Sequence, residues 1–245
     1  VNCIPAIDYP PVSFDDVYGQ SFTMDALELK SLFDQTLFAT SDKESRPILT
    51  GLNFKCEGKV LEVVATDTYR LTKKVINLQN ELQFNVTVPR NALDDVNKIV
   101  ELGQTVNIVI SDKKVSFDLG DCNINTRVIS GTYPDTSRLI PSEFSQTLNI
   151  STKELVGAVD RASILLTEKN NVVKLNMDSD EVFVSSKSME VGYVVEKLNE
   201  YAYEGEKLTI SFSAKYLLDA IRALASEEIS LQFTGDMKPI IIKSK

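Results

Sequence analysis

Hydrophobic and polar positions follow the same order twice along this chain. Residues 24–110 and residues 150–233 each predict an amphipathic helix, two strands, a bridging strand, a second amphipathic helix and a further strand. A repeat longer than about 50 residues is too long for a solenoid unit, so it indicates tandem copies of a whole domain. The matching positions of the first helix, at helical spacing, are Leu29, Leu32, Phe33 and Thr36 in one copy and Leu155, Ala158, Val159 and Ala162 in the other.

Both copies also start their first helix in the same way. Asp25 with Glu28, and Ser151 with Glu154, have the spacing of a capping box, in which the two side chains satisfy free backbone N–H groups at the helix start. The second helix and the strand before it repeat as well. The matched residues are Phe84, Val86, Val88, Pro89, Leu93, Asp95, Val96 and Ile99 in the first copy and Leu208, Ile210, Phe212, Ser213, Leu217, Asp219, Ala220 and Ala223 in the second.

The elements expected in the first copy are bounded by turn residues. They are a helix at Asp25–Thr40, strands at Ile48–Lys55 and Lys59–Ala65 joined by a turn at Glu57–Gly58, strands at Arg70–Ile76 and Phe84–Val88, a helix from Pro89 to Gly103, and closing strands at Val106–Ser111, Lys114–Asp118 and Asn123–Ile129.

Helices that sit among strands, rather than alternating with them, predict an α+β fold. In each copy we expect two helices packed on one face of an antiparallel sheet of about seven or eight strands. The second copy matches only two of the closing strands, at Ile229–Thr234 and Pro239–Lys243. A missing strand would leave an unpaired sheet edge, so we expect the sequence to stop short of a natural C-terminus.

Composition disfavours an enzyme. The chain contains no histidine, so it lacks the usual general base near neutral pH and the usual metal ligand. Its three cysteines cannot all pair and have no metal-ligand spacing, and its ten glycines form no phosphate-binding loop. We therefore expect no cofactor and no metal site. A net charge of −9 argues against a strongly basic nucleic-acid-binding face. No apolar run is long enough to span a bilayer, and we expect a soluble, cytoplasmic protein.

Several segments resemble the bacterial sliding clamp, the beta subunit of the replicative DNA polymerase (DNA polymerase III). The strings are RPILTGLNF (46–54), VATDTYRLT (64–72), VPR (88–90), YPDTSRLIP (133–141), NNVVKLN (170–176) and FSAKYLLDAI (212–221). The resemblance covers essentially the whole chain in family order. It implies three tandem domains, dimerised head to tail into a ring around duplex DNA, of which this chain has the second and third.

That resemblance sets the expected domains. Residues 1–19 would be a linker or tail from a missing first domain. Residues 20–142 would be the middle domain, and residues 143–245 a C-terminal domain without its last strand.

The resemblance also implies a partner-peptide pocket with an apolar floor and a polar rim. The residues of one subsite are Leu49, Thr66, Thr68, Tyr69, Arg70, Leu71, Pro134, Arg138 and Leu139, and those of its neighbour are Tyr216, Met237 and Pro239. Alternatively, Leu49, Leu71 and Leu139 are ordinary core and Thr68–Tyr69 is a simple polar turn. Many family members have Gly–His at that pair, so this chain departs from the family pattern at the rim.

The implied function is that of a processivity factor with no chemistry of its own. The replicative polymerase, the clamp loader and repair proteins would bind through short linear motifs, and duplex DNA would be held weakly, by encirclement. Lys43 and Arg46 match a family position near DNA, and the alternative is that they are plain surface cations. Without the first domain, we expect the chain to be unable to close a ring. Two alternatives are a tandem β-rich interaction module and a hydrolase that uses carboxylates.

Overall fold

The computed structural model describes residues 5, 8, 18–167 and 171–245. The linker expected over residues 1–19 therefore falls almost entirely outside the described residues. The chain divides into two compact units, Val1–Tyr133 and Pro134–Lys245. Each unit has its own hydrophobic core.

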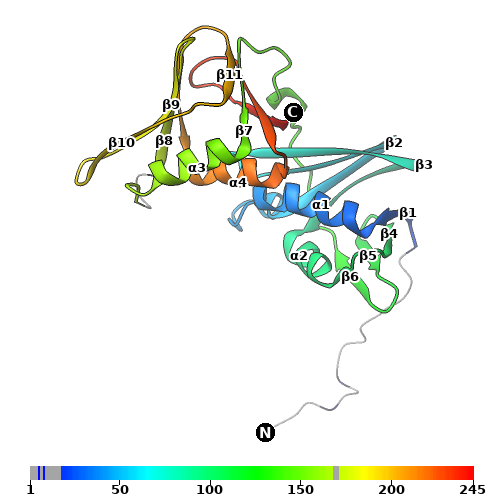
Figure 1. The fold of residues 1–245 in the computed structure, drawn as a ribbon. Helices are drawn as coiled ribbons and strands as arrows, with labels where there is room; N and C mark the ends of the chain where they lie inside the picture. Colours follow the sequence, from blue (N-terminus) through cyan, green and yellow to red (C-terminus); the bar gives the residue numbers. More distant parts are fainter. Residues whose placement is uncertain (1–4, 6–7, 9–17, 168–170) are drawn as a thin grey trace. The chain divides into compact units, whose positions relative to one another are not determined.

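The first unit combines two α-helices with two antiparallel sheets in its described part (Figure 1). One sheet has the strand order β1-β4-β5-β6, and the other consists of β2 paired with β3. The elements are β1 (Gln20–Asp25), α1 (Ala26–Thr36), the 3₁₀ helices η2 (Leu37–Ala39) and η3 (Pro47–Thr50), β2 (Gly51–Thr66), β3 (Leu71–Pro89), α2 (Arg90–Ile99), β4 (Thr105–Ile110), β5 (Lys114–Asp118) and β6 (Asn123–Arg127).

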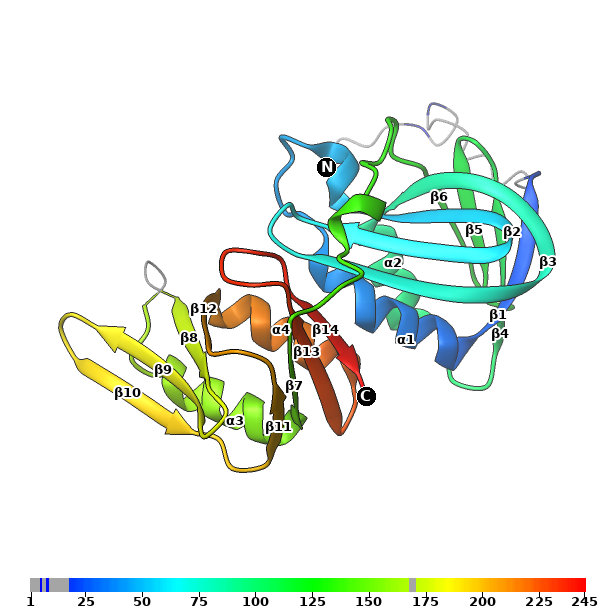
Figure 2. The ribbon, with the colours of Figure 1, turned by 90° about the horizontal axis from the view of Figure 1, so that it is seen from above.

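Strands β2 and β3 are longer than the strands expected in this region. The four predicted strands merge into two, and β3 curves around one end of β2 (Figure 2). The turn expected at Glu57–Gly58 lies inside β2, where the pairing register shifts and Gly58 has a φ of 66°. Glycine has no Cβ to oppose this left-handed conformation, so the chain changes register there without ending the element.

Two other boundaries differ from the prediction. The strand predicted to start at Ile48 is wrong over its first residues, because Pro47 to Thr50 form η3. Proline fixes its own φ and has no N–H to donate, which suits the first turn of a helix and not a ladder of strands. The second helix ends at Ile99 rather than at Gly103.

The helices of the first unit bury the stripe that the spacing predicts. Leu29, Leu32 and Phe33 of α1 are fully buried, as are Leu93 and Val96 of α2, and the two helices pack against each other. Each such side chain contributes roughly 1.5–3 kcal/mol on burial. The predicted core face is therefore confirmed.

The second unit repeats this plan with two α-helices in its described part. Its sheets have the strand orders β10-β9-β8-β12 and β11-β7-β13-β14, all antiparallel. The elements are the 3₁₀ helix η4 (Ser137–Leu139), β7 (Gln146–Ser151), α3 (Thr152–Ser163), β8 (Val172–Met177), β9 (Val182–Ser188), β10 (Gly192–Lys197), β11 (Tyr201–Glu204), β12 (Leu208–Ser213), α4 (Ala214–Leu224), β13 (Glu228–Phe233) and β14 (Ile241–Ser244).

Both units place two helices among antiparallel strands in the same order, and the predicted α+β class is confirmed. A strand precedes the first helix in both, β1 before α1 and β7 before α3, and neither strand was expected. Both pair with the strand that follows the second helix, β4 in one unit and β13 in the other. In the second unit, β14 forms one edge of its sheet.

The two helix starts are alike in sequence but differ in their hydrogen bonds. Asp25 accepts a hydrogen bond from the backbone N–H of Leu27 at 2.8 Å, as an N-cap should. Ser151 is the N-cap of α3, yet its side chain makes no capping hydrogen bond. Glu154 instead accepts from the backbone N–H groups of Asn199 and Glu200. The capping box predicted in the second copy is therefore wrong, because Glu154 is engaged by the segment between β10 and β11.

Candidate functional site

A small apolar cluster lies apart from the main core of the first unit. Leu49, Val64 and Tyr133 form its buried part, with Ile48 and Leu71 packed against them. Leu49 comes from η3, Val64 from near the end of β2 and Leu71 from the start of β3. Because Thr66 pairs with Leu71 across the two strands, the hairpin brings these residues to one place. The cluster brings together two predicted pocket residues, Leu49 and Leu71, with three residues that were not predicted for the pocket.

The alternative for Leu49, Leu71 and Leu139 was that they are ordinary core residues, and the three differ in how far they are buried. Leu49 is only 3% exposed, so it forms the bottom of the cluster and has little surface for a partner. Leu71 is half-buried. Leu139 is 56% exposed on η4 and belongs to the second unit. The last two therefore have apolar surface that a ligand could cover.

The turn between β2 and β3 is built around one carboxylate. Asp67 Oδ1 accepts from the backbone N–H groups of Tyr69 and Arg70, at 2.9 and 3.0 Å. Its Oδ2 accepts from the Nε of Arg70 at 3.0 Å. Thr66 adds its hydroxyl, which donates to the carbonyl of Arg70 at 2.7 Å and accepts from the N–H of Thr68 at 3.2 Å. These local side-chain bonds are typical of Asx and Ser/Thr turns.

Arg70 has a second partner besides Asp67. Its guanidinium carbon lies 5.3 Å from the centre of the Phe38 ring, within the range of a cation–π contact. The arginine thus joins the turn to the segment after α1. Its expected role as a rim group for a partner stays a prediction, and the geometry adds a structural role that the sequence did not indicate.

Tyr133 closes the cluster from the other side of the turn. Its hydroxyl accepts from the backbone N–H of Thr66 at 3.0 Å, and its ring is buried. Burial raises the pKa of Tyr133 to about 12, so the hydroxyl stays protonated and neutral at working pH. Tyr133 begins the string YPDTSRLIP, but no role was predicted for it. Neither the spacing of hydrophobic residues nor the amino-acid composition distinguishes this tyrosine from the other seven in the chain.

Two candidates that were expected in different sites lie next to each other. Tyr69 is 72% exposed, and the Nζ of Lys43 lies 5.9 Å from the centre of its ring. Lys43 belongs to the loop before η3, and this loop is fixed by a hydrogen bond from the N–H of Ser41 to the carbonyl of Leu49 at 2.8 Å. Arg46 is exposed at the N-cap of η3. The expected DNA-contact loop therefore borders the expected peptide rim within one unit.

The remaining candidates lie in the second unit. Pro134 and Arg138 are exposed in its first segment, which is shaped by a hydrogen bond from the N–H of Ser137 to Asp135 at 3.0 Å. Tyr216 is half-buried in the first turn of α4. Met237 and Pro239 are exposed in the segment between β13 and β14.

Met237 stands out among these residues. Its side chain is 96% exposed, and its φ is 55°, a left-handed conformation that only a few per cent of non-glycine residues adopt. An apolar side chain held in this way gains nothing from the unit's own core. It is a reasonable contact for a partner.

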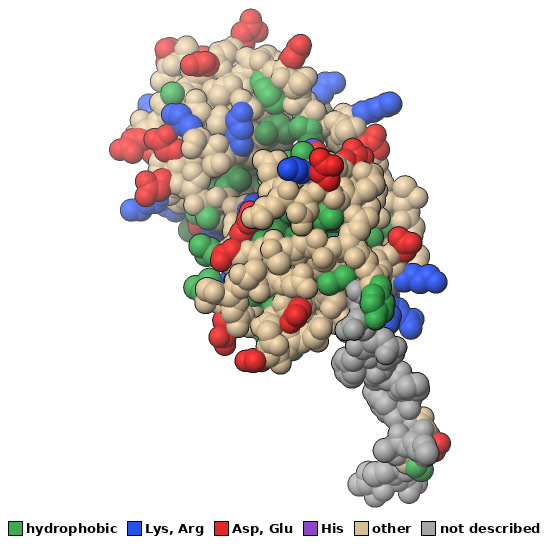
Figure 3. Space-filling model, turned by 90° about the vertical axis from the view of Figure 1, so that its right-hand side faces the viewer, with side chains coloured by type: hydrophobic (Ala, Val, Ile, Leu, Met, Phe, Trp, Pro, Cys, Tyr) green, Lys and Arg blue, Asp and Glu red, His purple; other side chains and the backbone are tan. Residues whose placement is uncertain are grey.

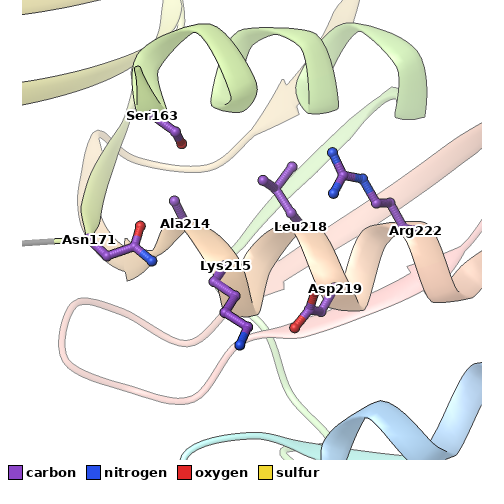
Figure 4. Close-up of a pocket in the computed structure, with 7 residues that line it drawn as sticks. All are labelled: Ser163, Asn171, Ala214, Lys215, Leu218, Asp219 and Arg222. Atoms are coloured by element: carbon purple, nitrogen blue, oxygen red, sulfur yellow. The ribbon is translucent and has the colours of Figure 1, made fainter. Parts of the chain in front are cut away.

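A hollow in the second unit lies between the end of α3 and α4 (Figure 4). Lys215 and Asp219 of α4 both border it, so its charges are mixed. Arg222, at the far end, is paired with Asp160 at 3.0 Å. A shallow hollow with balanced charges does not indicate a catalytic centre or a strong anion site.

Charges on the surface are also mixed. On the face in Figure 3, acidic and basic side chains alternate without a continuous basic field. Among the described residues, no group of three or more His, Cys, Asp or Glu side chains could hold a metal ion. None of the helices in the same part of the chain is long and apolar enough to cross a membrane.

Comparison with known proteins gives the same two-part division. Residues 23–135 match the family model described as DNA polymerase III beta subunit, central domain, and residues 137–245 match that of its C-terminal domain. The chain is 42% identical to the beta sliding clamp of Bacillus subtilis over all of its own length and 66% of that protein. It is 39% identical to the beta sliding clamp of Staphylococcus epidermidis, over 96% of this chain and 62% of that one.

A solved structure agrees with these matches. The DNA polymerase sliding clamp from Bacillus subtilis superposes with a TM-score of 0.92 at 38% identity, over 98% of this chain and 64% of that chain. The chain therefore spans slightly less than two thirds of the length of these relatives.

Proposed function

Because the chain belongs to the family of the DNA polymerase III beta subunit, we propose that it works in DNA replication as part of a sliding clamp. In this function the protein encircles duplex DNA and tethers polymerases and repair factors to it. It is a processivity factor and does no chemistry of its own. The alternative of an unrelated interaction module is not favoured by the family match.

The peptide site is the centre of this proposal. The observation that supports this site best is an apolar cluster next to a turn that exposes Tyr69. The cluster consists of Leu49, Val64, Tyr133 and Leu71. A partner segment with one Gln and a few apolar residues would cover the exposed side of Leu71 and pack against Tyr69. Leu139, together with Pro134, Arg138, Tyr216, Met237 and Pro239, would add further contacts, as the family pattern implies.

Simple energetics fit partners that exchange. Burying two apolar side chains of a peptide contributes roughly 1.5–3 kcal/mol each, before the cost of ordering the segment. Adding a few hydrogen bonds gives a dissociation constant on the order of micromolar. A clamp that serves a polymerase, a clamp loader and repair proteins in turn needs affinities of this size.

Weak DNA binding also fits the charge. The chain carries a net charge of −9, so retention on DNA would come from enclosure rather than from neutralising phosphates. Lys43 and Arg46 would make occasional phosphate contacts. Substituting Arg46 should lower a small salt-dependent affinity and leave peptide binding intact.

Ring closure would need a surface on the second unit. Strand β10 is an edge strand, and its Tyr193 and Val195 are largely exposed on one face. An exposed apolar edge strand is a template for pairing with another chain. We assign this edge to the head-to-tail contact of the ring.

The test is capture of the chain by a short synthetic peptide with a Gln and apolar residues, taken from a polymerase. The sliding-clamp proposal expects capture, and the same peptide with its apolar residues replaced by Ala should not bind. Equal binding of both peptides, or of neither, would refute the proposal and favour an unrelated interaction module.

A further inference from the structure

The turn after β2 holds a strained residue. Thr68 has a φ of 81°, which is unfavourable for a β-branched side chain. Strain of this kind persists only where the surroundings fix the backbone, and it concentrates at binding sites and switches. The residues that fix this turn are therefore of functional interest.

Asp67 fixes one side of the turn. Its carboxylate accepts from the N–H groups of Tyr69 and Arg70 and from the Arg70 guanidinium, with distances of 2.9 to 3.0 Å. Bonds to an ionised acceptor are about twice as strong as neutral ones. The side chain of Asp67 is only 13% exposed, so a partner has little access to it.

Tyr133 fixes the other side. Its hydroxyl accepts from the N–H of Thr66 at 3.0 Å, at the residue where β2 ends. The ring belongs to the apolar cluster with Leu49 and Val64, so the position of the hydroxyl is set by packing. The backbone of the turn is thereby tied to the floor of the peptide site.

We propose that Asp67 and Tyr133 are positioning residues of the peptide site, which hold the strained turn so that Tyr69 and Leu71 present a preformed surface to a partner segment. This inference rests on the proposed peptide-binding function. Asp67 and the Tyr133 hydroxyl need not touch the peptide. Their contribution is to remove the cost of ordering the turn when the peptide binds.

The experiment compares peptide affinities of Asp67→Ala, Asp67→Asn and Tyr133→Phe by calorimetry, using the polymerase-derived peptide as probe. Asp67→Ala removes three hydrogen bonds, and we expect binding at least tenfold weaker. Asp67→Asn keeps an oxygen that can accept from the two backbone N–H groups, and it should bind within about threefold of the wild type. Tyr133→Phe keeps the ring and should weaken binding about fivefold.

Two matched variants separate positioning from a general loss of stability. Asp118 accepts from the N–H of Gly120 at 3.0 Å, in a comparable turn of the same unit. The hydroxyl of Tyr203, in the second unit, donates to the carbonyl of Glu206. Asp118→Ala, which loses one hydrogen bond, and Tyr203→Phe should each lower the melting temperature and leave peptide affinity unchanged.

Amide hydrogen exchange gives a readout that does not depend on the peptide. In Tyr133→Phe, the N–H of Thr66 should exchange at least tenfold faster while the amides of Leu93 and Val96 in α2 keep their protection. Faster exchange of the α2 amides as well would mean that the hydroxyl only supports the whole unit, which would overturn the positioning role.

The outcomes distinguish this inference from the proposed function. Failure of the wild-type chain to bind the peptide would refute the function and the inference with it. Binding by the wild type, with unchanged affinity in both Asp67→Ala and Tyr133→Phe, would refute the inference alone. An affinity loss in Asp118→Ala equal to that in Asp67→Ala would also refute it.

Discussion

The same hairpin position has a different surface in each unit. In the first unit, the turn from β2 to β3 is polar, fixed by Asp67 and placed over a buried apolar cluster. In the second unit, the corresponding turn from β9 to β10 exposes Met189 and Val191, and the strand that follows exposes Tyr193. One turn borders a buried apolar cluster, and the other forms part of an exposed apolar edge.

The parts of the fold that repeat are the helices and sheets, and the parts that differ are the surface turns. Helices, sheets and buried stripes repeat because both copies must bury the same faces, whereas turns at the surface are free to diverge. We propose that the first unit uses its turn to support a peptide site. The second uses the equivalent position for an edge that suits pairing with another chain. Substitutions at the two positions should therefore affect different activities.

The largest expected effect is on peptide binding. Replacing Leu71 and Leu139 together by Ala should abolish binding of a clamp-motif peptide, because each loses roughly 1.5–3 kcal/mol of apolar contact. Calorimetry measures the affinity, and circular dichroism should show that the chain remains folded. Undiminished binding would count against this pocket.

The matched change lies on the second unit. Val191→Ser with Tyr193→Ser alters two apolar side chains of the β9–β10 hairpin that are 68% and 78% exposed. We expect no change in peptide affinity. A loss comparable to that of the leucine pair would mean that the two hairpins share one activity.

The next effect is a loss of stability at high pH. Burial raises the pKa of Tyr133 to about 12, above an ordinary value near 10. The folded state holds this proton more tightly, so its contribution to stability is complete below pH 10 and is lost as the pH rises through about 12. The difference corresponds to roughly 2–3 kcal/mol at most.

Comparison with Tyr133→Phe isolates this contribution. Denaturant unfolding of both proteins at pH 9 and at about pH 11.5 should show the wild type losing more stability than the variant. Other tyrosines and lysines titrate equally in both and cancel. Parallel losses would contradict the assignment of this proton to Tyr133.

Much of the helical core was predictable, because a helix that buries one face needs apolar residues at a regular spacing. The stripe from Leu29 to Thr36 and its counterpart from Leu155 to Ala162 were visible as spacing and are buried as expected. The peptide candidates were found by resemblance and not by period. No such signal marked Asp67 or Tyr133. Tyr133 bonds to Thr66, 67 positions away in sequence, and Asp67 bonds to Arg70 within one turn, and neither bond leaves a regular pattern of residues.

Capping shows the same limit. Asp25 and Ser151 look equivalent in sequence, but only Asp25 makes a side-chain capping bond. Asp25→Ala should therefore destabilise the protein by about 1 kcal/mol, and Ser151→Ala by less than about 0.5 kcal/mol. Thermal unfolding of both variants measures this difference. Equal losses would mean that the two helix starts are capped alike.

The smallest effect concerns the strained turn. Thr68→Gly relieves a left-handed conformation that costs roughly 1–2 kcal/mol, against an entropic cost of about 0.5–1 kcal/mol for glycine. We expect a net gain in stability of up to about 1 kcal/mol. Denaturant unfolding measures it, and a clear loss would show that Thr68 is not strained. No comparable gain is expected at Gly192, which already supplies glycine at its φ of 128°.

The most direct test is to map a polymerase-derived peptide onto the chain by NMR chemical-shift perturbation. We predict saturable shifts at about micromolar affinity, centred on Leu49, on the segment from Val64 to Leu71 and on Tyr133. Shifts centred instead on the β9–β10 hairpin, or no saturable shifts at all, would contradict it.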